Sequence, residues 1–548
     1  MKTRSLTLLM AAAMTVSAVG CSSNNTSTNS PAGSTAAATG DKKILSVQIG
    51  PNPETMDPAL NSALDAGNMI LESFECLLTN DKDGNAAPGA AESWEVSEDG
   101  KTYTFKLRDG LKWSDGTPLT SEDFVYSWQR VCDPNVAAPY AETVLSMVEG
   151  YDEAIAGDIT KLNVEAPDEK TFIVHLSNAC PYFESLAAFA TLSPVQKATV
   201  EKNGDAWATA AETYVSNGPF HVTEWVPNSY ILMEKNPNYW NAENIKIDGI
   251  KFNLIEDANA AYNAYNAGEI AFIKDVPTEE IASLEGRDDF FVAPMIGTYY
   301  ISLNTEKEPY TNPDVRRALS LAIDREYLAN TLMQGTYSPA GNFVGPGWMD
   351  TDGTEFYKNS NGGESFFKPT ADIEAAKAAL EAAGYPNGEG LPVLTYSTND
   401  SGYHKAVAEY LQQAWKEIGV NLDVEIVEWA SFTPMRRNGD FEIARNGWVG
   451  DYTDPSNILT LLYSTNGNND GKYNNPEYDA QLDLASTTLD PKERSAALHK
   501  AEEILIEDAG CIPVAYYNDF WLENKDVVDG IWHSAYGYWH FEDAELVG

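Results

Sequence analysis

Residues 435–455 place charged side chains beside a predicted strand and a tight turn. Phe441, Ile443 and Arg445 alternate along the chain, which predicts a strand with these side chains on one face. A turn of the form Asp-Tyr-x-x-Pro follows and begins at Asp451. An aspartate here suits either capping of the turn or binding of a ligand ammonium group, since a buried ammonium needs a compensating carboxylate.

No catalytic signature accompanies this segment. The sequence lacks a GxSxG motif, an HExxH motif, a Walker loop and a cysteine–histidine signature. Paired carboxylates carry no signal in a chain with 82 acidic residues. The histidines form no i, i+4 pair or three-ligand cluster, so neither a metal site nor a cofactor is expected. The protein is predicted to bind a ligand and not to be an enzyme.

The N-terminal residues are typical of an export signal. Lys2 and Arg4 precede an apolar stretch that is too short to span a bilayer, and small residues lead into Cys21. This pattern predicts a lipoprotein signal peptide over residues 1–20, with a diacylglyceryl group attached to Cys21. The alternative is an ordinary secretory signal with a chance cysteine. Residues 21–42 are rich in Ser, Thr, Asn and Ala, which predicts a flexible tether.

The amino-acid composition argues against two classes of binding partner. The formal net charge of −46 argues against nucleic acid and against an anionic membrane surface, and its simplest role is solubility. Four further cysteines follow in the sequence: Cys76, Cys132, Cys180 and Cys511. Their spacing is not that of metal ligands, and they are predicted to be small buried apolar residues. Disulfide bonds are the alternative, because exported proteins can form them.

The remaining chain is too long for one hydrophobic core, so two or three lobes are expected. Strands are predicted over residues 43–49, 103–107, 298–302, 421–427 and 512–517. Helices are predicted over residues 65–78, after Thr120, from Pro313, over 371–383 and 404–418, and from Pro491. Helices followed by strands indicate an α/β protein.

These segments resemble, in order and almost from end to end, the oligopeptide- and dipeptide-binding proteins of bacterial ABC importers, extracellular solute-binding protein family 5. The resemblance is carried by residues 91–124, Ser216-Asn-Gly-Pro-Phe220, Glu234-Lys-Asn-Pro-Asn-Tyr-Trp240, residues 314–325 and Ala382-Ala-Gly-Tyr-Pro386. Most of these motifs are expected to be structural, with Tyr239 and Trp240 in the core and the Asp-Gly pairs in turns.

The resemblance implies a type II periplasmic-binding-protein-like α/β fold, with two hinged α/β lobes and a third lobe inserted in the first. The expected boundaries are lobe I over 43–77, 205–297 and 515–548, inserted lobe II over 78–204, and lobe III over 298–514. Closure on a ligand that bridges both hinged lobes shifts the population toward the closed state.

The resemblance also implies a peptide site. Asp451 matches the acceptor of the ligand's α-ammonium group, and the main chain of Gly447, Trp448 and Val449 matches the segment that pairs with an extended peptide. The other matches are Arg445 and Arg436 for ligand carboxylates, His404 for the C-terminus of longer peptides, and Trp429 for a side-chain pocket. Surface ion pairs for the arginines, helix capping for His404 and a core position for Trp429 stay open as alternatives.

The implied function is an extracytoplasmic, lipid-anchored, monomeric solute-binding subunit that delivers short peptides to an ABC permease and its ATPase. A nickel chelate, haem, an oligosaccharide or a signalling peptide are the alternative ligands on the same fold. Three departures from enterobacterial members leave peptide length and side-chain preference open: Ser62, Val449 and Ser302.

Overall fold

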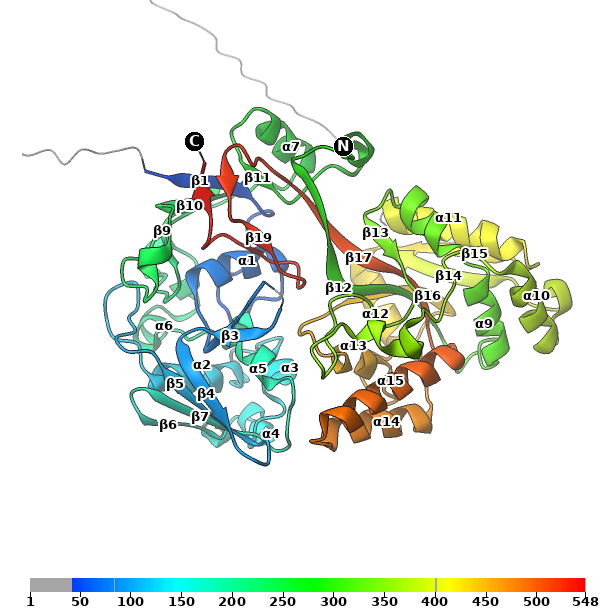
Figure 1. Ribbon diagram of the computed structural model, residues 1–548, viewed down its shortest axis with the longest axis horizontal. Helices are drawn as coiled ribbons and strands as arrows, with labels where there is room; N and C mark the ends of the chain where they lie inside the picture. The colour runs from blue at the N-terminus through cyan, green and yellow to red at the C-terminus, as the bar shows by residue number, and fades with distance from the viewer. Residues whose placement is uncertain (1–41, 83, 400–401, 548) are drawn as a thin grey trace, which may run out of the picture. The chain divides into compact units, whose positions relative to one another are not determined.

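Two long strands, β12 (Phe290–Leu303) and β17 (Ile512–Glu523), run antiparallel to each other through the centre of the main sheet in this computed structural model (Figure 1). Their pairing shifts register between Pro294 and Thr298. Only the second part of β12 and the first part of β17 were predicted as strands, because alternation of apolar and polar residues is interrupted where the register shifts.

The main sheet contains eleven strands among the described residues. Their order is β15 (Leu422–Val427), β14 (Leu394–Asn399), β16 (Ile443–Val449), β12, β17, β11 (Phe272–Ile273), β1 (Ile44–Gln48), β10 (Gly249–Asn253), β9 (Tyr230–Lys235) and β8 (Phe220–Val226), with β13 (Tyr337–Pro339) on β17. The sheet is mixed: it contains parallel pairs such as β1–β10 and β14–β15 and antiparallel pairs such as β9–β10 and β12–β16. The α/β class is therefore confirmed.

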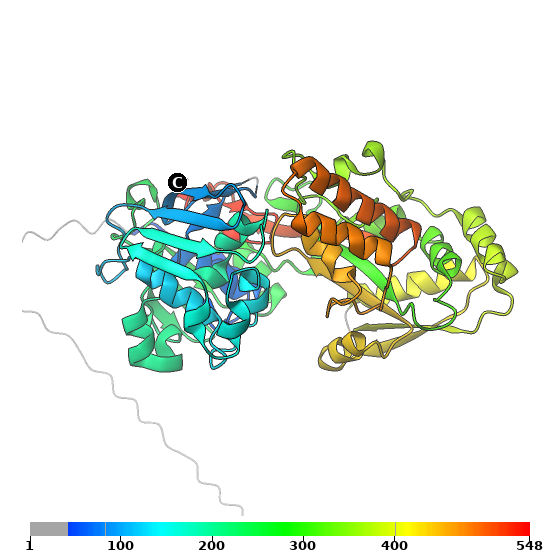
Figure 2. The ribbon, with the colours of Figure 1, turned by 90° about the horizontal axis from the view of Figure 1, so that it is seen from below.

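A separate antiparallel sheet has the order β4 (Ala91–Val96), β5 (Thr102–Leu107), β7 (Thr171–His175) and β6 (Val164–Asp168). Helix α2 (Ser121–Val131) packs against it (Figure 2). Thr120 and Asp123 form a capping box at the start of this helix. The predicted strand over 103–107 and the predicted helix after Thr120 are thus confirmed.

The remaining helices are α1 (Leu64–Ser73), α3 (Ala141–Leu145), α4 (Tyr151–Ile155), α5 (Phe183–Ala187), α6 (Lys197–Asn203), α7 (Ala258–Asn266), α8 (Ile281–Leu284), α9 (Pro313–Leu321), α10 (Ile373–Ala382), α11 (Gly402–Lys416), α12 (Trp429–Asn438), α13 (Ser456–Leu459), α14 (Pro476–Thr487) and α15 (Pro491–Glu507). Short strands pair as β2 (Leu78–Asn80) with β3 (Ala86–Pro88), β18 (Val528–Asp529) with β21 (Glu545–Leu546), and β19 (Trp532–His533) with β20 (Trp539–His540). The predicted helices at Pro313, 371–383, 404–418 and Pro491 are confirmed as α9, α10, α11 and α15.

Helix α1 is shorter than predicted, since it ends at Ser73 and not at Leu78. Asn217 explains the difference. Its side-chain oxygen accepts a hydrogen bond from the N–H of Glu75, and its side-chain amide donates to the carbonyl of Glu75. These bonds satisfy the backbone of Glu75 in an extended conformation, which competes with the helix.

Trp240 corrects a second expectation, because it lies on the surface and not in the core. Its side chain is 38% exposed, the guanidinium of Arg108 lies 3.6 Å from the ring centroid, and Nε1 donates to Glu75. The prediction for the cysteines is confirmed: Cys76, Cys132, Cys180 and Cys511 are buried free thiols.

The structure describes residues 42–82, 84–399 and 402–547. The predicted signal peptide, most of the tether and Cys21 lie outside these residues, and residues 43–548 form one unit. Among the described helices, none is long and apolar enough to cross a membrane. The division into lobes stays a prediction.

Candidate functional site

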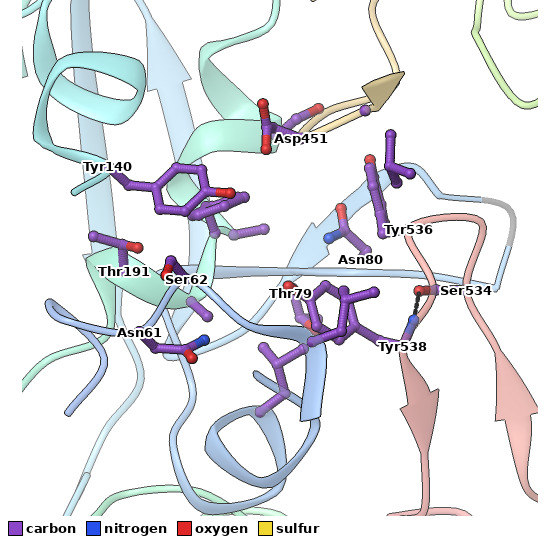
Figure 3. A pocket seen from close by; sticks show the side chains of 18 of the residues that line it. Asn61, Ser62, Thr79, Asn80, Tyr140, Thr191, Asp451, Ser534, Tyr536 and Tyr538 are labelled. Atoms are coloured by element: carbon purple, nitrogen blue, oxygen red, sulfur yellow. Dashed lines mark hydrogen bonds between the residues drawn. The ribbon is translucent and has the colours of Figure 1, made fainter. Parts of the chain in front are cut away.

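A cavity of about 170 Å³ lies at the C-terminal end of β16. Its walls come from residues 61–64 before α1, from β2, from residues 188–191, from Val449–Asp451 and from the C-terminal segment 534–540. Tyr140, Asp451, Tyr536 and Tyr538 face this space together (Figure 3). A second hollow of about 390 Å³ has Ser185 in common with the lining of the first.

Asn457 holds the carboxylate of Asp451 at the cavity wall. The side-chain amide of Asn457 donates to Oδ2 of Asp451 at 3.5 Å, and the backbone N–H of Asp451 donates to Oδ1 of Asn457 at 3.4 Å. Nε1 of Trp448 donates to the same Oδ1 at 2.7 Å. The side-chain amide of Asn457 thus contacts the carboxylate of Asp451, the backbone N–H of Asp451 and the indole of Trp448. Asn457, in the segment that follows β16, therefore orients the Asp451 carboxylate.

The charge of Asp451 has no cationic partner within the part of the chain that the structure describes. Among the described residues, no lysine, arginine or histidine lies within ion-pair distance of its carboxylate. Burial raises the pKa of Asp451 to about 6, while hydrogen bonds from Asn457 and Tyr140 oppose the rise. A partly buried carboxylate with raised pKa that faces a cavity is suited to accept a cation from a ligand.

Strand β16 has a backbone edge that no other described strand covers along most of its length. It pairs with β12 from Ile443 to Val449, but with β14 only at Ile443 and Ala444. The carbonyl of Arg445 accepts a hydrogen bond from Arg436, and the N–H of Gly447 is bonded to the side chain of Asn446. No described strand pairs with this edge from Arg445 to Val449, so a further extended chain can pair there if it displaces these two side-chain hydrogen bonds.

Gly447 is required at its position by a close approach of Tyr517. A Cβ atom at Gly447 would overlap the hydroxyl group of Tyr517. The aromatic ring thus lies directly over the open part of β16, and a larger residue would displace either the ring or the strand.

Arg445 lies among tyrosines. Its Nη2 donates to the hydroxyl of Tyr517 at 3.4 Å, and its guanidinium carbon lies 5.4 Å from the centroid of Tyr299. Nε of Arg445 is buried without a hydrogen-bond partner. Within the part of the chain that the structure describes, no acidic side chain pairs with it, so a buried positive charge is left for a ligand anion.

His404 lies in α11 beside this group. It is buried, and its Nδ1 lies 3.4 Å from the hydroxyl of Tyr299. Burial, followed by the positive charge of Arg445, lowers the pKa of His404 to about 3. The imidazole is therefore neutral at physiological pH and is suited to hydrogen bonding, not to charge pairing.

Arg436 is placed differently from Arg445. Arg436 is ion-paired with Asp470, with Nε to Oδ2 at 2.7 Å and side chains 13% and 4% exposed, which leaves less of its charge for a ligand. Trp429 begins α12. The ligand roles of both residues stay predictions.

A ring stack joins the neighbourhood of Asp451 to the segment before α5. Tyr452 and Tyr182 lie parallel within 4°, with ring centroids 4.4 Å apart. Tyr182 precedes α5, whereas Tyr452 follows Asp451 directly. The stack therefore connects two segments that are distant in sequence.

Comparison with known proteins identifies the family. The model of the bacterial extracellular solute-binding proteins, family 5, matches residues 85–470. The chain belongs to this family. It is 34% identical to the oligopeptide-binding protein OppA of Bacillus subtilis over 498 residues, which cover 89% of this chain and 90% of that protein.

Two further relatives of this family 5 protein are described with different ligands, one with deoxycholate and one with a peptide. The probable deoxycholate-binding periplasmic protein YgiS of Escherichia coli is 34% identical, over 85% of this chain and 86% of that protein. The crystal structure of Haemophilus influenzae OppA in complex with the peptide RPPGFSPFR matches with a TM-score of 0.72 and 32% identity, over 93% of this chain and 100% of that one. The family is made up of solute-binding proteins, and its type II periplasmic-binding fold confirms the expected architecture.

Sequence reasoning missed several residues of the family 5 site. Asn457 lies six positions after Asp451. Its place close to the turn could have indicated a contact with Asp451, because short polar side chains often cap such turns. Tyr140 and Tyr538 are far away in the sequence, and nothing in their local patterns indicates the cavity. Of the departures, Ser62 and Val449 line the cavity, whereas Ser302 is buried and accepts a hydrogen bond from Asn446.

Proposed function

We propose that this family 5 protein captures short peptides and that Asp451 accepts the peptide's α-ammonium group. The observation that carries the proposal is a fixed, partly buried carboxylate that faces a cavity and has no cationic partner among the described residues. A ligand ammonium group would supply the missing charge and form charge-assisted hydrogen bonds.

The peptide main chain pairs with the open edge of β16. Strand addition of this kind uses backbone groups that every peptide has, so it gives affinity with little dependence on side chains. On the side away from β12, no described strand pairs with residues 445–449, which supports this arrangement.

Arg445 binds a carboxylate at the other end, and His404 assists as a neutral hydrogen-bonding group. From Arg445 to Asp451 the chain advances six residues, or roughly 20 Å when fully extended. An extended peptide that spans this gap has about six residues. His404 lies next to Arg445 through the shared contact with Tyr299.

The protein acts outside the cytoplasm, anchored to the outer face of the cell membrane through lipid on Cys21, and delivers its ligand to a membrane permease driven by an ATPase. Two acyl chains on Cys21 are enough for stable anchoring. Ligand bound between Asp451 and the segments across the cavity favours the closed state, and the Tyr182–Tyr452 stack adds to that closure.

Thermal unfolding with a panel of di- to octapeptides tests the peptide claim, because a ligand that binds only the folded protein raises the unfolding temperature. Ligand retained from expression is first removed by unfolding and refolding, and is identified by mass spectrometry. Retained peptides and stabilisation by panel members support the proposal. A retained bile acid, haem, nickel chelate or sugar, with no stabilisation by any peptide, would contradict it.

A further inference from the structure

A second group of ionisable side chains lies behind the wall of the peptide cavity. Glu72 belongs to α1, His540 to β20 and Glu542 to the segment that follows β20. Each offers one ligand atom, and the three atoms lie within 4.8 Å of one another. Among the described residues, this is the one group of three histidine, cysteine, aspartate or glutamate side chains that converges so closely.

The side chain of Glu72 is fully buried, and half of its carboxylate is unsatisfied. Oε1 accepts the backbone N–H of Phe541 at 2.8 Å. Oε2 is buried and has no hydrogen-bond partner. A buried carboxylate oxygen without a partner is costly unless a proton or a cation occupies the space beside it.

The neighbours of Glu72 increase its need for positive charge. Burial raises the pKa of Glu72, and the carboxylates of Glu542, which lies within hydrogen-bonding reach, and of Asp543 raise it further. No lysine or arginine of the described chain is ion-paired with Glu72 or Glu542, and the one cationic candidate in contact is His540, whose Nδ1 lies 3.6 Å from Oε2 of Glu542. The ring of His540 is held in place by stacking on Trp532 at 3.8 Å.

We propose that Glu72, His540 and Glu542 bind a divalent transition-metal ion of the zinc class. One imidazole nitrogen and two carboxylates form a donor set that suits Zn²⁺, whereas Ca²⁺ and Mg²⁺ prefer oxygen ligands alone. Bonds of about 2.0–2.2 Å bring the ligand atoms to about 3–4 Å from one another, so the group tightens slightly when the ion binds. Glu542, whose side chain is 35% exposed, is free to make this movement and leaves a path from solvent.

The ion connects the C-terminal segment to α1 across one wall of the peptide cavity. His540 lines that cavity, and so do residues 61–64, which lead into α1. The site does not depend on which ligand the cavity takes, because none of its three donors is needed to contact that ligand. The bound ion holds the C-terminal segment and α1 together at this wall of the cavity, and it is therefore expected to raise the stability of the folded protein.

Zinc binding to the purified, metal-stripped protein tests the site by isothermal titration calorimetry and elemental analysis. The expected result is one Zn²⁺ per chain, with a higher unfolding temperature. Glu72→Gln and His540→Gln are expected to weaken the affinity about tenfold or more, since each removes a donor. His533→Gln is the matched control: it lies on the paired strand β19, is hydrogen-bonded to Asp519, and should bind zinc as the parent does.

If the folded Glu72→Gln and His540→Gln variants bind zinc as tightly as the parent does, the parent binds an adventitious ion only and the proposal is overturned. No saturable zinc binding by the parent would also overturn it, and would leave Glu72 and Glu542 sharing a proton. If the variants do not fold, anomalous scattering from a zinc-soaked crystal of the parent decides. A peak bonded to Glu72, His540 and Glu542 supports the site, and peaks only elsewhere contradict it.

Discussion

Replacing Asp451 with Asn is expected to stabilise the peptide-free protein although it weakens peptide binding. Burial raises the pKa of Asp451 from an ordinary 3.8 to about 6. Between these values the folded protein holds a proton that the unfolded chain has released, so stability falls as the pH rises through this window. Above pH 6 the whole deficit is present, and below the unfolded pKa it vanishes.

The size of the effect follows from the shift. Roughly two pK units at about 1.4 kcal/mol each give an upper limit of about 3 kcal/mol at neutral pH. Two effects reduce this gain in the free energy of unfolding: the side chain is partly exposed, and its contacts with Asn457 and Tyr140 are lost. The Asn variant should therefore be about 1–2 kcal/mol more stable at pH 7.5 and little changed at pH 4. For free-amine peptides it should lose about 1.5–3 kcal/mol of binding free energy.

Urea unfolding of refolded, peptide-free protein at both pH values measures the change in stability. Asp454→Asn is the matched control, because Asp454 pairs with Arg494, whose side chain is only 4% exposed. Breaking that buried pair should destabilise the protein by about 3 kcal/mol, the opposite sign. Destabilisation of the Asp451 variant at pH 7.5 would refute the reasoning, since it would mean that the carboxylate is already compensated in the free protein.

Three further predictions concern the same region. Affinity for free-amine peptides should fall about tenfold per pH unit below pH 6, where free Asp451 becomes protonated; calorimetry that finds constant affinity down to pH 4.5 would contradict this. Gly447→Ala should cost about 1–3 kcal/mol of stability through overlap with the Tyr517 hydroxyl, and adding Tyr517→Phe should recover part of it in urea unfolding; a double variant no more stable than the single one would be inconsistent with that cause. Tyr182→Leu should lower peptide affinity by about 0.5–1.5 kcal/mol by removing the stack on Tyr452; unchanged affinity would show that the stack does not aid closure.

Local signals predicted much of the fold. Thr120, Asn312 and Asp490 cap helices where their side chains and the following residues indicate a helix start. The errors occur where tertiary contacts outweigh local preference. Asn217 ends α1 early from a position more than 140 residues away, and β12 and β17 continue past a register shift that interrupts their alternation.

The candidate site was predictable only in part, for a similar reason. Asp451 and Arg445 lie on one continuous segment, so their order along a ligand could be inferred from that segment and its resemblance. Tyr140 reaches the cavity from a distant segment, and no local pattern marks it. The same limit hid the proposed metal site, because Glu72 and His540 come from opposite ends of the described chain and no i, i+4 spacing joins them.

The most direct test of the account is calorimetric titration with one peptide in two forms, with a free and with an N-acetylated N-terminus. Acetylation replaces the charged ammonium group with a neutral acetamide and leaves the other residues of the peptide unchanged. If Asp451 is the vacant acceptor, the acetylated form should bind at least about tenfold more weakly, a loss of about 1.4 kcal/mol or more. Equal affinity of the two forms would contradict the central claim that the carboxylate of Asp451 binds the peptide's N-terminus.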